Sequence, residues 1–359
     1  MVQPVGTTNA QSNSVGAMLD PRNLLEHYRN ALDWDLLRKF EGVSILNTRQ
    51  FVRREVVELA KFSALLEQTE IASSHPLDGK ICITSFFEAS TRTRLSFEAA
   101  TLRCDGRVLS VPDGKVTGIA KGESLADIGE MFNTYGDLVI MRHPETTAVE
   151  EIRRNLRLPL INAGNGTGEH PTQALLDWYA LLKWRPDLAT EDFTGDKFHI
   201  GIVGTPRDMR AVKSFMRMSM LFDNAIGKIT VVSEQKQPLG RELAEDVENS
   251  PIEVEIRSDM QSVLHEFDVI YMNSIALLEG SYELLGKEFS LDANSNLKEN
   301  AAILHPLARR DELDASLDRT PHNLYFAEAA GAVFMRQALL VSVLGRIDSL
   351  PDSIIFLSS

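Results

Sequence analysis

The sequence predicts an α/β protein built from two doubly wound parallel sheets. Short apolar runs of strand length alternate along the chain with longer amphipathic runs, which is the pattern of parallel strands joined by crossover helices. The alternation starts again after Arg185-Pro186, so we expect the boundary between the two sheets near residues 185–195. With 359 residues, the chain is long enough for two domains of ordinary size.

The first series of elements begins with a helix at 52–66, where apolar residues such as Val52, Val56 and Val57 follow helical spacing. Gly, Lys and polar residues dominate 112–123, which predicts a mobile loop. The elements expected after the first helix are a strand at 80–84, a helix at 92–102, a strand at 107–111, a helix beginning at 124–128, a strand at 137–141, a helix at 146–156, a strand at 159–163 and a helix at 174–184.

The second series repeats the alternation after the boundary and shows no fixed-period repeat of the solenoid kind. Its expected elements are a strand at 197–203, a helix at about 210–221, a strand at 228–232, a helix at 243–247, strands at 267–272 and 302–304, and a long final helix at 329–347.

Composition narrows the classes of function. Hydrophobic residues make up 43% of the chain and charged residues 25%, which is typical of a soluble globular protein. The formal net charge of −14 argues against nucleic-acid or acidic-membrane partners, because no general positive field would attract a polyanion. An anion site in this chain must therefore be local.

Cysteine content and hydropathy indicate a cytoplasmic protein. The only cysteines, Cys82 and Cys104, fall in apolar segments, so we expect buried thiols in a reducing compartment rather than a disulfide. We expect no apolar run of membrane-spanning length, and the N-terminus lacks the layout of a secretory signal.

The stretch between the strand at 80–84 and the helix at 92–102 predicts an anion site. Unpaired N–H groups and the positive end of the dipole at a helix N-terminus attract anions. Ser90, Thr91 and Thr93 add hydroxyl donors, and Arg92 and Arg94 add charged forks. The alternative is an ordinary helix cap followed by two surface arginines.

Further polar residues follow the predicted strands and are expected at the same rim, because ligands of open parallel sheets bind beyond the carboxyl ends of the strands. They are Arg142-His143, the run at 170–173 and the run at 305–307. Arg142 directly follows a buried apolar strand, where a cation is costly unless it has a partner or a function. A histidine such as His170, taken alone, is more often structural than functional. Together these residues suit a phosphate attached to a polar carbonyl group.

Five ordered motifs resemble those of aspartate carbamoyltransferase catalytic chains, and the resemblance runs from roughly residue 40 to 350. Ornithine carbamoyltransferases share the first motif but carry a reactive cysteine where this chain has Pro306, which favours the aspartate branch. The motifs are FFEASTRTR at 86–94, KGESLAD at 121–127, MRHP at 141–144, HPTQALLD at 170–177 and HPL at 305–307.

The resemblance implies that carbamoyl phosphate binds first and an amino-acid-type amine second, with no cofactor and no metal. Pyrimidine synthesis follows only if the amine is aspartate. By resemblance, the residues that hold the donor are Ser90, Thr91, Arg92 and Thr93 at the phosphate, Arg142, His170 and Thr93 at the carbonyl oxygen, and Gln173 with the Leu307 backbone at the carbamoyl NH2.

The resemblance also implies the assembly and the domains. Lys121 matches a lysine that reaches into a neighbouring subunit's site, so we expect at least a trimer with shared active sites; the alternative is a simple solvated turn. Regulatory subunits are left open. The expected domains are a flexible extension at 1–36, a carbamoyl phosphate domain at 37–188 completed by 327–350 as the last helix returns, and an acceptor domain at 189–326.

The acceptor side departs from the family pattern. Ser274 and Ala276 replace an arginine and a glutamine that grip aspartate, and losing one partner of a buried charge pair costs about 2–5 kcal/mol. The family's other aspartate-binding arginine is retained here as Arg210. Lys121 and Arg207 are further candidate cations for the acceptor.

The last motif is altered as well, since Ala308 replaces a proline whose peptide bond is cis in the family. A cis bond before alanine costs roughly 3–4 kcal/mol, so we expect this loop to be reshaped.

Two functions remain open. The first is carbamoyl transfer to L-aspartate or a related amine. The alternative is a non-catalytic or regulatory homologue that binds carbamoyl phosphate or a partner chain without turnover. A nucleotide-binding protein is disfavoured, because the run GIVGTP at 201–206 lacks the full glycine fingerprint.

Overall fold

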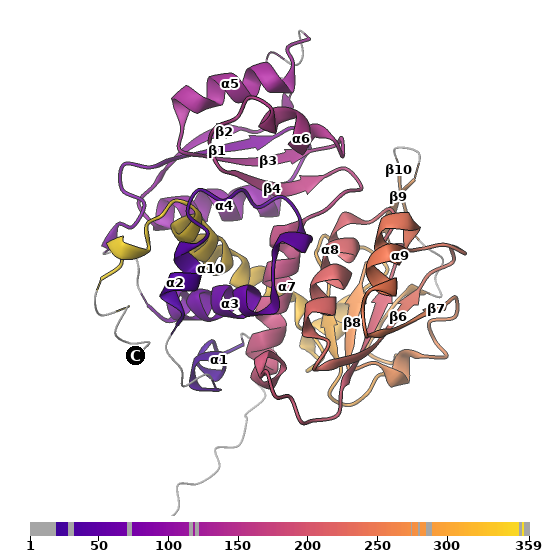
Figure 1. The fold of residues 1–359 in the computed structure, drawn as a ribbon. Coiled ribbons are helices and arrows are strands. Elements are labelled where there is room, and N and C mark those ends of the chain that lie inside the picture. Colours follow the sequence, from indigo (N-terminus) through magenta and orange to yellow (C-terminus); the bar gives the residue numbers. More distant parts are fainter. Residues whose placement is uncertain are drawn as a thin grey trace, which may run out of the picture.

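The computed structural model describes residues 19–27, 32–69, 74–114, 118, 122–273, 275–278, 281–284, 289–351 and 354. Most of the predicted N-terminal extension and half of the loop at 112–123 therefore lie outside the described residues. Figure 1 shows two α/β units side by side, each built around one parallel sheet.

The first sheet has the strand order β2-β1-β3-β4, with all pairs parallel. Strands β1, β3 and β4 are buried because their residues alternate between two layers of helices, whereas the edge strand β2 is mostly exposed. Ile83 and Val139 face α5 and α6, whereas Cys82 and Ile140 face the core that holds α4 and α10 (Figure 1). The elements are β1 (Ile81–Phe86), α4 (Thr91–Arg103), β2 (Arg107–Val111), α5 (Leu125–Tyr135), β3 (Leu138–His143), α6 (Ala148–Arg153) and β4 (Leu160–Asn165).

The second sheet has the strand order β11-β8-β5-β6-β7, again parallel. Helices α8 and α9 cover one face, and 3-10 turns and the chain near Phe289 cover the other. The elements are β5 (Phe198–Val203), α8 (Arg210–Ser219), β6 (Ile226–Val232), α9 (Gly240–Glu248), β7 (Glu253–Arg257), β8 (Val269–Met272), the antiparallel hairpin β9 (Ile275–Leu278) and β10 (Ser281–Leu284), and β11 (Ala302–Leu304).

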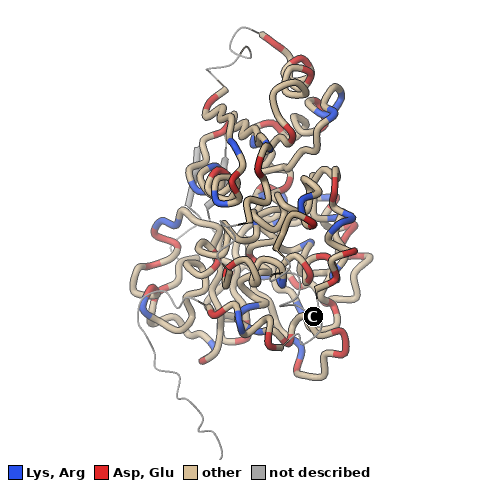
Figure 2. Tube along the Cα trace, turned by 90° about the vertical axis from the view of Figure 1, so that its left-hand side faces the viewer, with Lys and Arg blue, Asp and Glu red and all other residues tan. Residues whose placement is uncertain are grey.

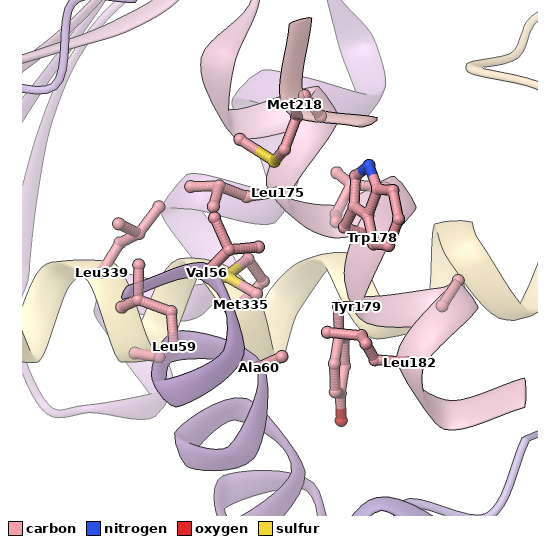
Figure 3. Close-up of a cluster of buried hydrophobic side chains, with 14 of the residues drawn as sticks. Val56, Leu59, Ala60, Leu175, Trp178, Tyr179, Leu182, Met218, Met335 and Leu339 are labelled. Atoms are coloured by element: carbon pink, nitrogen blue, oxygen red, sulfur yellow. The ribbon is translucent and has the colours of Figure 1, made fainter. Parts of the chain in front are cut away.

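One apolar core continues from the first unit into the second. Figure 3 shows Leu175 and Trp178 of α7 between Met218 of α8 and Val56 of α3, and Trp178 stacks on Phe222 with ring centroids 3.7 Å apart. Because side chains of α7 pack against both units, buried apolar area joins the units along this helix. The helices of this layer are α1 (Arg22–His27), α2 (Trp34–Arg38), α3 (Arg53–Gln68), α7 (Pro171–Trp184) and α10 (Tyr325–Val343).

The final helix returns to the first unit, as expected, and packs against α3, α4 and α7. The expectation that no apolar run reaches membrane-spanning length is wrong for α10 by length and composition. However, 72% of its apolar window is buried inside the protein, so this helix is a core element. The helix also begins at Tyr325, four residues earlier than the sequence predicted.

The remaining predicted elements are present, with shifts at their ends. The helix expected at 146–156 is shorter, and the one expected at 210–221 is helical to Ser219 and continues as a 3-10 turn to Phe222. Sequence reasoning missed α2, β7 and the β9–β10 hairpin. Cys82 and Cys104 are free and buried, as predicted. Lys and Arg alternate with Asp and Glu along the trace in Figure 2, without one basic patch among the described residues.

Candidate active site

A cavity of about 360 Å³ lies between the two sheets, beyond the carboxyl ends of their strands. Side chains that follow β1, β3 and β4 reach it from the first unit, and side chains that follow β5, β8 and β11 reach it from the second. Parallel strands direct their carboxyl ends to one rim, which explains why distant loops meet there. Within the described residues, no group of three or more His, Cys, Asp or Glu side chains is arranged to hold a metal ion.

The predicted anion site forms the first wall of this cavity. Ser90 has extended backbone and precedes α4, so the first N–H groups of the helix point away from the helix body. Arg92 lines the cavity, and burial lowers the pKa of its guanidinium. Thr93 is buried one residue further along, at a neighbouring cavity that also involves Arg92. The Arg92 side chain is exposed to solvent and Arg94 is half-buried, so it is the position of Arg92 on the cavity wall, and not burial, that separates it from an ordinary surface arginine.

Arg142 and Arg210 meet in the cavity on the carboxylate of Glu88. Arg142 donates from Nη2 to Glu88 Oε1 at 2.8 Å and from Nη1 to Ser90 Oγ at 3.2 Å. Arg210 binds both carboxylate oxygens of Glu88, at 2.9 and 2.7 Å, and the carbonyl of Gly166 at 2.9 Å. Glu88 comes from the first unit and Arg210 from the second, so this ion pair joins the two units across the cavity.

The charge of Glu88 is stabilised where it lies. Burial raises the pKa of its carboxyl group, but the hydrogen bonds and charges of Arg210 and Arg142 outweigh burial and place the pKa below its ordinary value. Sequence reasoning missed Glu88 as a site residue. The sequence did contain a signal for it. Glu88 is an acid within the stretch predicted to bind an anion, and an acid at such a place requires a cationic partner.

His170 is buried and neutral at the base of the cavity. Its backbone N–H donates to Ser214 Oγ at 2.8 Å, and its Nδ1 lies 3.4 Å from the Thr172 hydroxyl. Burial, followed by the charges of Arg142, Arg210 and Arg336, lowers the pKa of His170 well below its ordinary value. A neutral imidazole beside arginines can polarise a carbonyl group through a hydrogen bond without carrying charge itself.

Gln173 lies one helical turn further along α7, and its amide nitrogen is fixed by two buried acids. Nε2 donates to Asp177 Oδ1 at 2.7 Å and to Glu328 Oε1 at 2.8 Å. Burial raises the pKa of Asp177 to about 7 and that of Glu328 well above its ordinary value. Because Nε2 is engaged in both bonds, the amide presents Oε1 as an acceptor for an NH2 group. Gln173 lines the neighbouring cavity rather than the central one.

The loop that follows β11 forms the wall nearest Leu307. His305 is buried, with Nε2 2.9 Å from Glu312 Oε1, and its Nδ1 accepts the Leu307 N–H at 2.8 Å. Burial lowers the pKa of His305. The Leu307–Ala308 peptide bond is cis.

The acceptor candidates are distributed unevenly. Arg210 and Leu307 line the cavity, whereas Arg207 does not: it pairs with Asp208 at 3.0 Å and contacts the Gln237 carbonyl. Lys121 and Ser274 lie outside the described residues. Ala276 lies on the β9 strand of the hairpin, which is described by its backbone.

The fold and the site define a two-unit α/β protein with an arginine-rich binding cavity between two parallel sheets. The chain belongs to the aspartate/ornithine carbamoyltransferase family. Residues 44–183 match the carbamoyl-P binding domain of that family, and residues 196–343 match its Asp/Orn binding domain.

Relatives and solved structures agree with this membership. The chain is 33% identical over 316 residues to the aspartate carbamoyltransferase catalytic subunit of Pyrobaculum islandicum, covering 85% of this chain and 99% of the relative. It is 32% identical over 321 residues to that of Methanopyrus kandleri, covering 86% and 99%. Aspartate transcarbamoylase from Trypanosoma cruzi, in complex with carbamoyl aspartate and phosphate, superposes with a TM-score of 0.74 at 30% identity, covering 86% and 98%. The same enzyme in complex with carbamoyl phosphate and aspartate gives the same score and identity.

Proposed function

We propose that this protein transfers the carbamoyl group of carbamoyl phosphate to the amino group of L-aspartate or a related amine and releases phosphate. The observation that carries this proposal is the meeting of Arg142 and neutral His170 in one cavity with the N-terminus of α4. These groups suit a phosphate bonded directly to a carbonyl carbon, as in an acyl phosphate, and family membership gives the reaction.

Each donor residue has a proposed role. Arg142 and His170 bind the carbonyl oxygen, and Thr93 assists them from the start of α4. The Gln173 Oε1 and the Leu307 carbonyl accept the carbamoyl NH2. The phosphate is held by hydroxyl, guanidinium and backbone donors of the remaining residues, Ser90, Thr91, Arg92 and Thr93.

The chemistry needs positioned donors rather than a protein nucleophile. The amine nitrogen forms a bond to the carbonyl carbon, the bond from that carbon to the phosphate oxygen breaks, and phosphate leaves with the electron pair. Negative charge grows on the carbonyl oxygen, where fixed donors such as Arg142 stabilise it most. Holding the two substrates together supplies a further large part of the rate. The amine must lose a proton, which the departing phosphate can accept.

On the acceptor side, we propose Arg210 as a ligand of the incoming amino acid, with Lys121 supplied by a neighbouring subunit. Arg210 is bound to Glu88 in this structure, so an acceptor carboxylate must replace Glu88 or share Arg210 with it. Arg207 is held by Asp208, which lines the cavity, so its contribution would pass through that acid.

We further propose the domain limits 37–188 with 327–350 and 189–326, and a cytoplasmic homotrimer. The trimer is supported by exposed apolar residues of the first unit, Leu95 and Leu102 on α4 and Leu109 on the edge strand β2, which packs against α4. The cytoplasm is supported by the two free, buried thiols. Sedimentation velocity tests the trimer, and a monomer at assay concentration would contradict it.

A steady-state assay of phosphate release with carbamoyl phosphate and a panel of amines, starting with L-aspartate, tests the function. We expect saturable release that requires the amine. Turnover with another amine alone would retain the transferase and reject aspartate as its acceptor. Binding of carbamoyl phosphate without turnover for any amine would favour the non-catalytic alternative.

A further inference from the structure

The charged side chains that line the central cavity are paired unequally. The two acids are both occupied, since Glu88 is bound by Arg142 and Arg210, and Asp208 is bound by Arg207. Within the part of the chain that the structure describes, Arg92 and Arg310 are the arginines of the cavity wall without a carboxylate partner for their side chains. A guanidinium in a binding cavity that no acid neutralises is available to an anionic ligand.

These two arginines reach the cavity from different units. Arg92 is on the first turn of α4, among the hydroxyl groups of the proposed phosphate site. Arg310 follows β11 in the second unit, three residues after Leu307. Arg92 is therefore the arginine without an acid partner at the proposed phosphate site, and Arg310 is the one that the second unit, which also supplies Arg210, brings to the cavity.

The backbone of Arg310 is held in a fixed position relative to the site. Its N–H group donates to both carboxylate oxygens of Glu312, at 3.0 and 2.9 Å. The same carboxylate binds Nε2 of His305 at 2.9 Å, and His305 in turn accepts the Leu307 N–H. Glu312 is buried, so one acid ties the backbone at Arg310 to the loop that contacts the donor. Fixed placement of this kind lowers the ordering cost of ligand binding.

We propose that Arg310 binds a carboxylate of the acceptor and replaces the arginine that the family carries where this chain has Ser274. This proposal rests on the proposed function and narrows it: the acceptor is an amino acid with a second carboxylate, read by Arg310 together with Arg210. Arg310 is the better first contact for an incoming anion, because Arg210 must give up part of its bond to Glu88 whereas the Arg310 side chain has no such pair to break. The long arginine side chain also suits a bidentate contact with a carboxylate.

The test compares two ligands on one variant. N-(phosphonacetyl)-L-aspartate carries the phosphonate, carbonyl and both acceptor carboxylates, whereas phosphonoacetamide lacks the amino acid portion. We expect Arg310→Gln to weaken binding of the first compound roughly 10- to 100-fold, as for loss of one charge-assisted hydrogen bond, and to leave binding of the second unchanged. Titration calorimetry on the assembled protein measures both. Arg310→Lys keeps the charge but loses the bidentate guanidinium. Its affinity for N-(phosphonacetyl)-L-aspartate should lie between those of the unmodified protein and Arg310→Gln.

Arg241→Gln is the matched control, because Arg241 is an exposed arginine of the second unit that pairs with Glu245 on α9 and does not line the cavity. Equal losses for both compounds in Arg310→Gln, or no loss for either, would overturn the assignment of Arg310. If the unmodified protein binds neither compound, the proposed function itself fails. If it binds phosphonoacetamide alone, the acceptor is not a dicarboxylic amino acid and the Arg310 proposal fails while carbamoyl phosphate binding stands.

Discussion

Two glutamates of the first unit are bound by arginines of the same helix of the second unit, and they lie in very different surroundings. Glu88 meets Arg210 at the first residue of α8, with side chains 20% and 16% exposed. Glu169 meets Arg217 two turns further along at 2.5 Å, with side chains 9% and 4% exposed. Both pairs cross between the units, but only the first lies in the substrate cavity.

The number of partners separates the two pairs as clearly as burial does. Glu169 Oε2 also accepts the Thr48 N–H at 2.8 Å and its hydroxyl at 2.6 Å, and Arg217 also binds Asp246 at 2.6 Å. Glu88 is held by arginines alone among the described residues, and a substrate anion can compete for both of them. The same kind of ion pair therefore serves two purposes. Glu88–Arg210, at the start of α8, is a contact that a substrate anion can replace, whereas Glu169–Arg217, two turns later, is a fixed structural contact that we call the buried joint.

Between the two ends, α8 holds the segment that leads into His170. Lys213 donates to the Thr167 carbonyl at 2.7 Å, and Ser214 accepts the His170 N–H at 2.8 Å. Because these residues share one face of the helix with the two arginines, the buried joint at Arg217 fixes the position of α8 on which the site depends.

The largest effect is expected from breaking the buried joint. Arg217→Met leaves Glu169 buried without its cation, and removing one partner of a buried pair costs about 3–5 kcal/mol. Urea unfolding should show this loss in the free energy of unfolding. The double variant with Glu169→Gln should recover part of it, since no uncompensated charge remains; a loss below about 1 kcal/mol in the single variant would place the pair with ordinary surface salt bridges.

Removing an arginine that binds Glu88 in the cavity should affect turnover rather than stability. Arg142→Ala removes the proposed donor to the carbonyl oxygen, and loss of such a donor costs about 10²–10³ in kcat. The matched variant Arg153→Ala alters an exposed arginine of α6 in the same unit and should leave kcat unchanged. If kcat of Arg142→Ala falls less than about 10-fold while the protein stays folded by circular dichroism, Arg142 does not stabilise the transition state.

A third acidic site, Asp177 with Glu328, is held by the Gln173 amide and should respond to pH. Burial raises the pKa of Asp177 to about 7, so the folded state keeps a proton that the unfolded state releases near pH 4. Stability contributed by this proton is therefore present at low pH and lost as pH rises toward 7. Relative to Asp177→Asn, we expect the free energy of unfolding to fall by roughly 2 kcal/mol between pH 5 and 7. Parallel pH profiles for the two proteins would show that Asp177 does not titrate there.

The contrast between the two ion pairs also shows what sequence reasoning can reach. Buried strands such as β3 and β4 are visible because they contain short apolar runs, Leu138–Met141 and Leu160-Ile161, and the anion site is visible because its donors are contiguous in the chain. The strand β7, with the sequence EVEIR, was missed because an edge strand carries charges in place of an apolar run.

Residues whose meaning comes from distant partners were not predictable from their own neighbourhood. Glu88 and Glu169 are ordinary acids in the sequence, and their roles arise from α8, 122 and 48 residues away in the chain. Arg310 is likewise an exposed-looking arginine until the fold places it on the cavity wall. Arg207 illustrates the opposite case, since sequence position made it a candidate and the fold pairs it with Asp208.

The smallest effect is expected from Glu88→Gln, and it tests the comparison most directly. Glu88 is partly exposed, so solvent already screens its ion pairs, and we expect a loss of only about 1 kcal/mol in the free energy of unfolding. Gln is nearly isosteric and its amide oxygen still accepts a hydrogen bond, and the Arg210 guanidinium keeps its contact with the Gly166 carbonyl. Urea unfolding of Glu88→Gln beside Glu169→Gln gives the contrast in one experiment. Equal losses in the two variants would mean that burial and partner number do not distinguish the two ends of α8, and that the contact in the cavity is as permanent as the joint behind it.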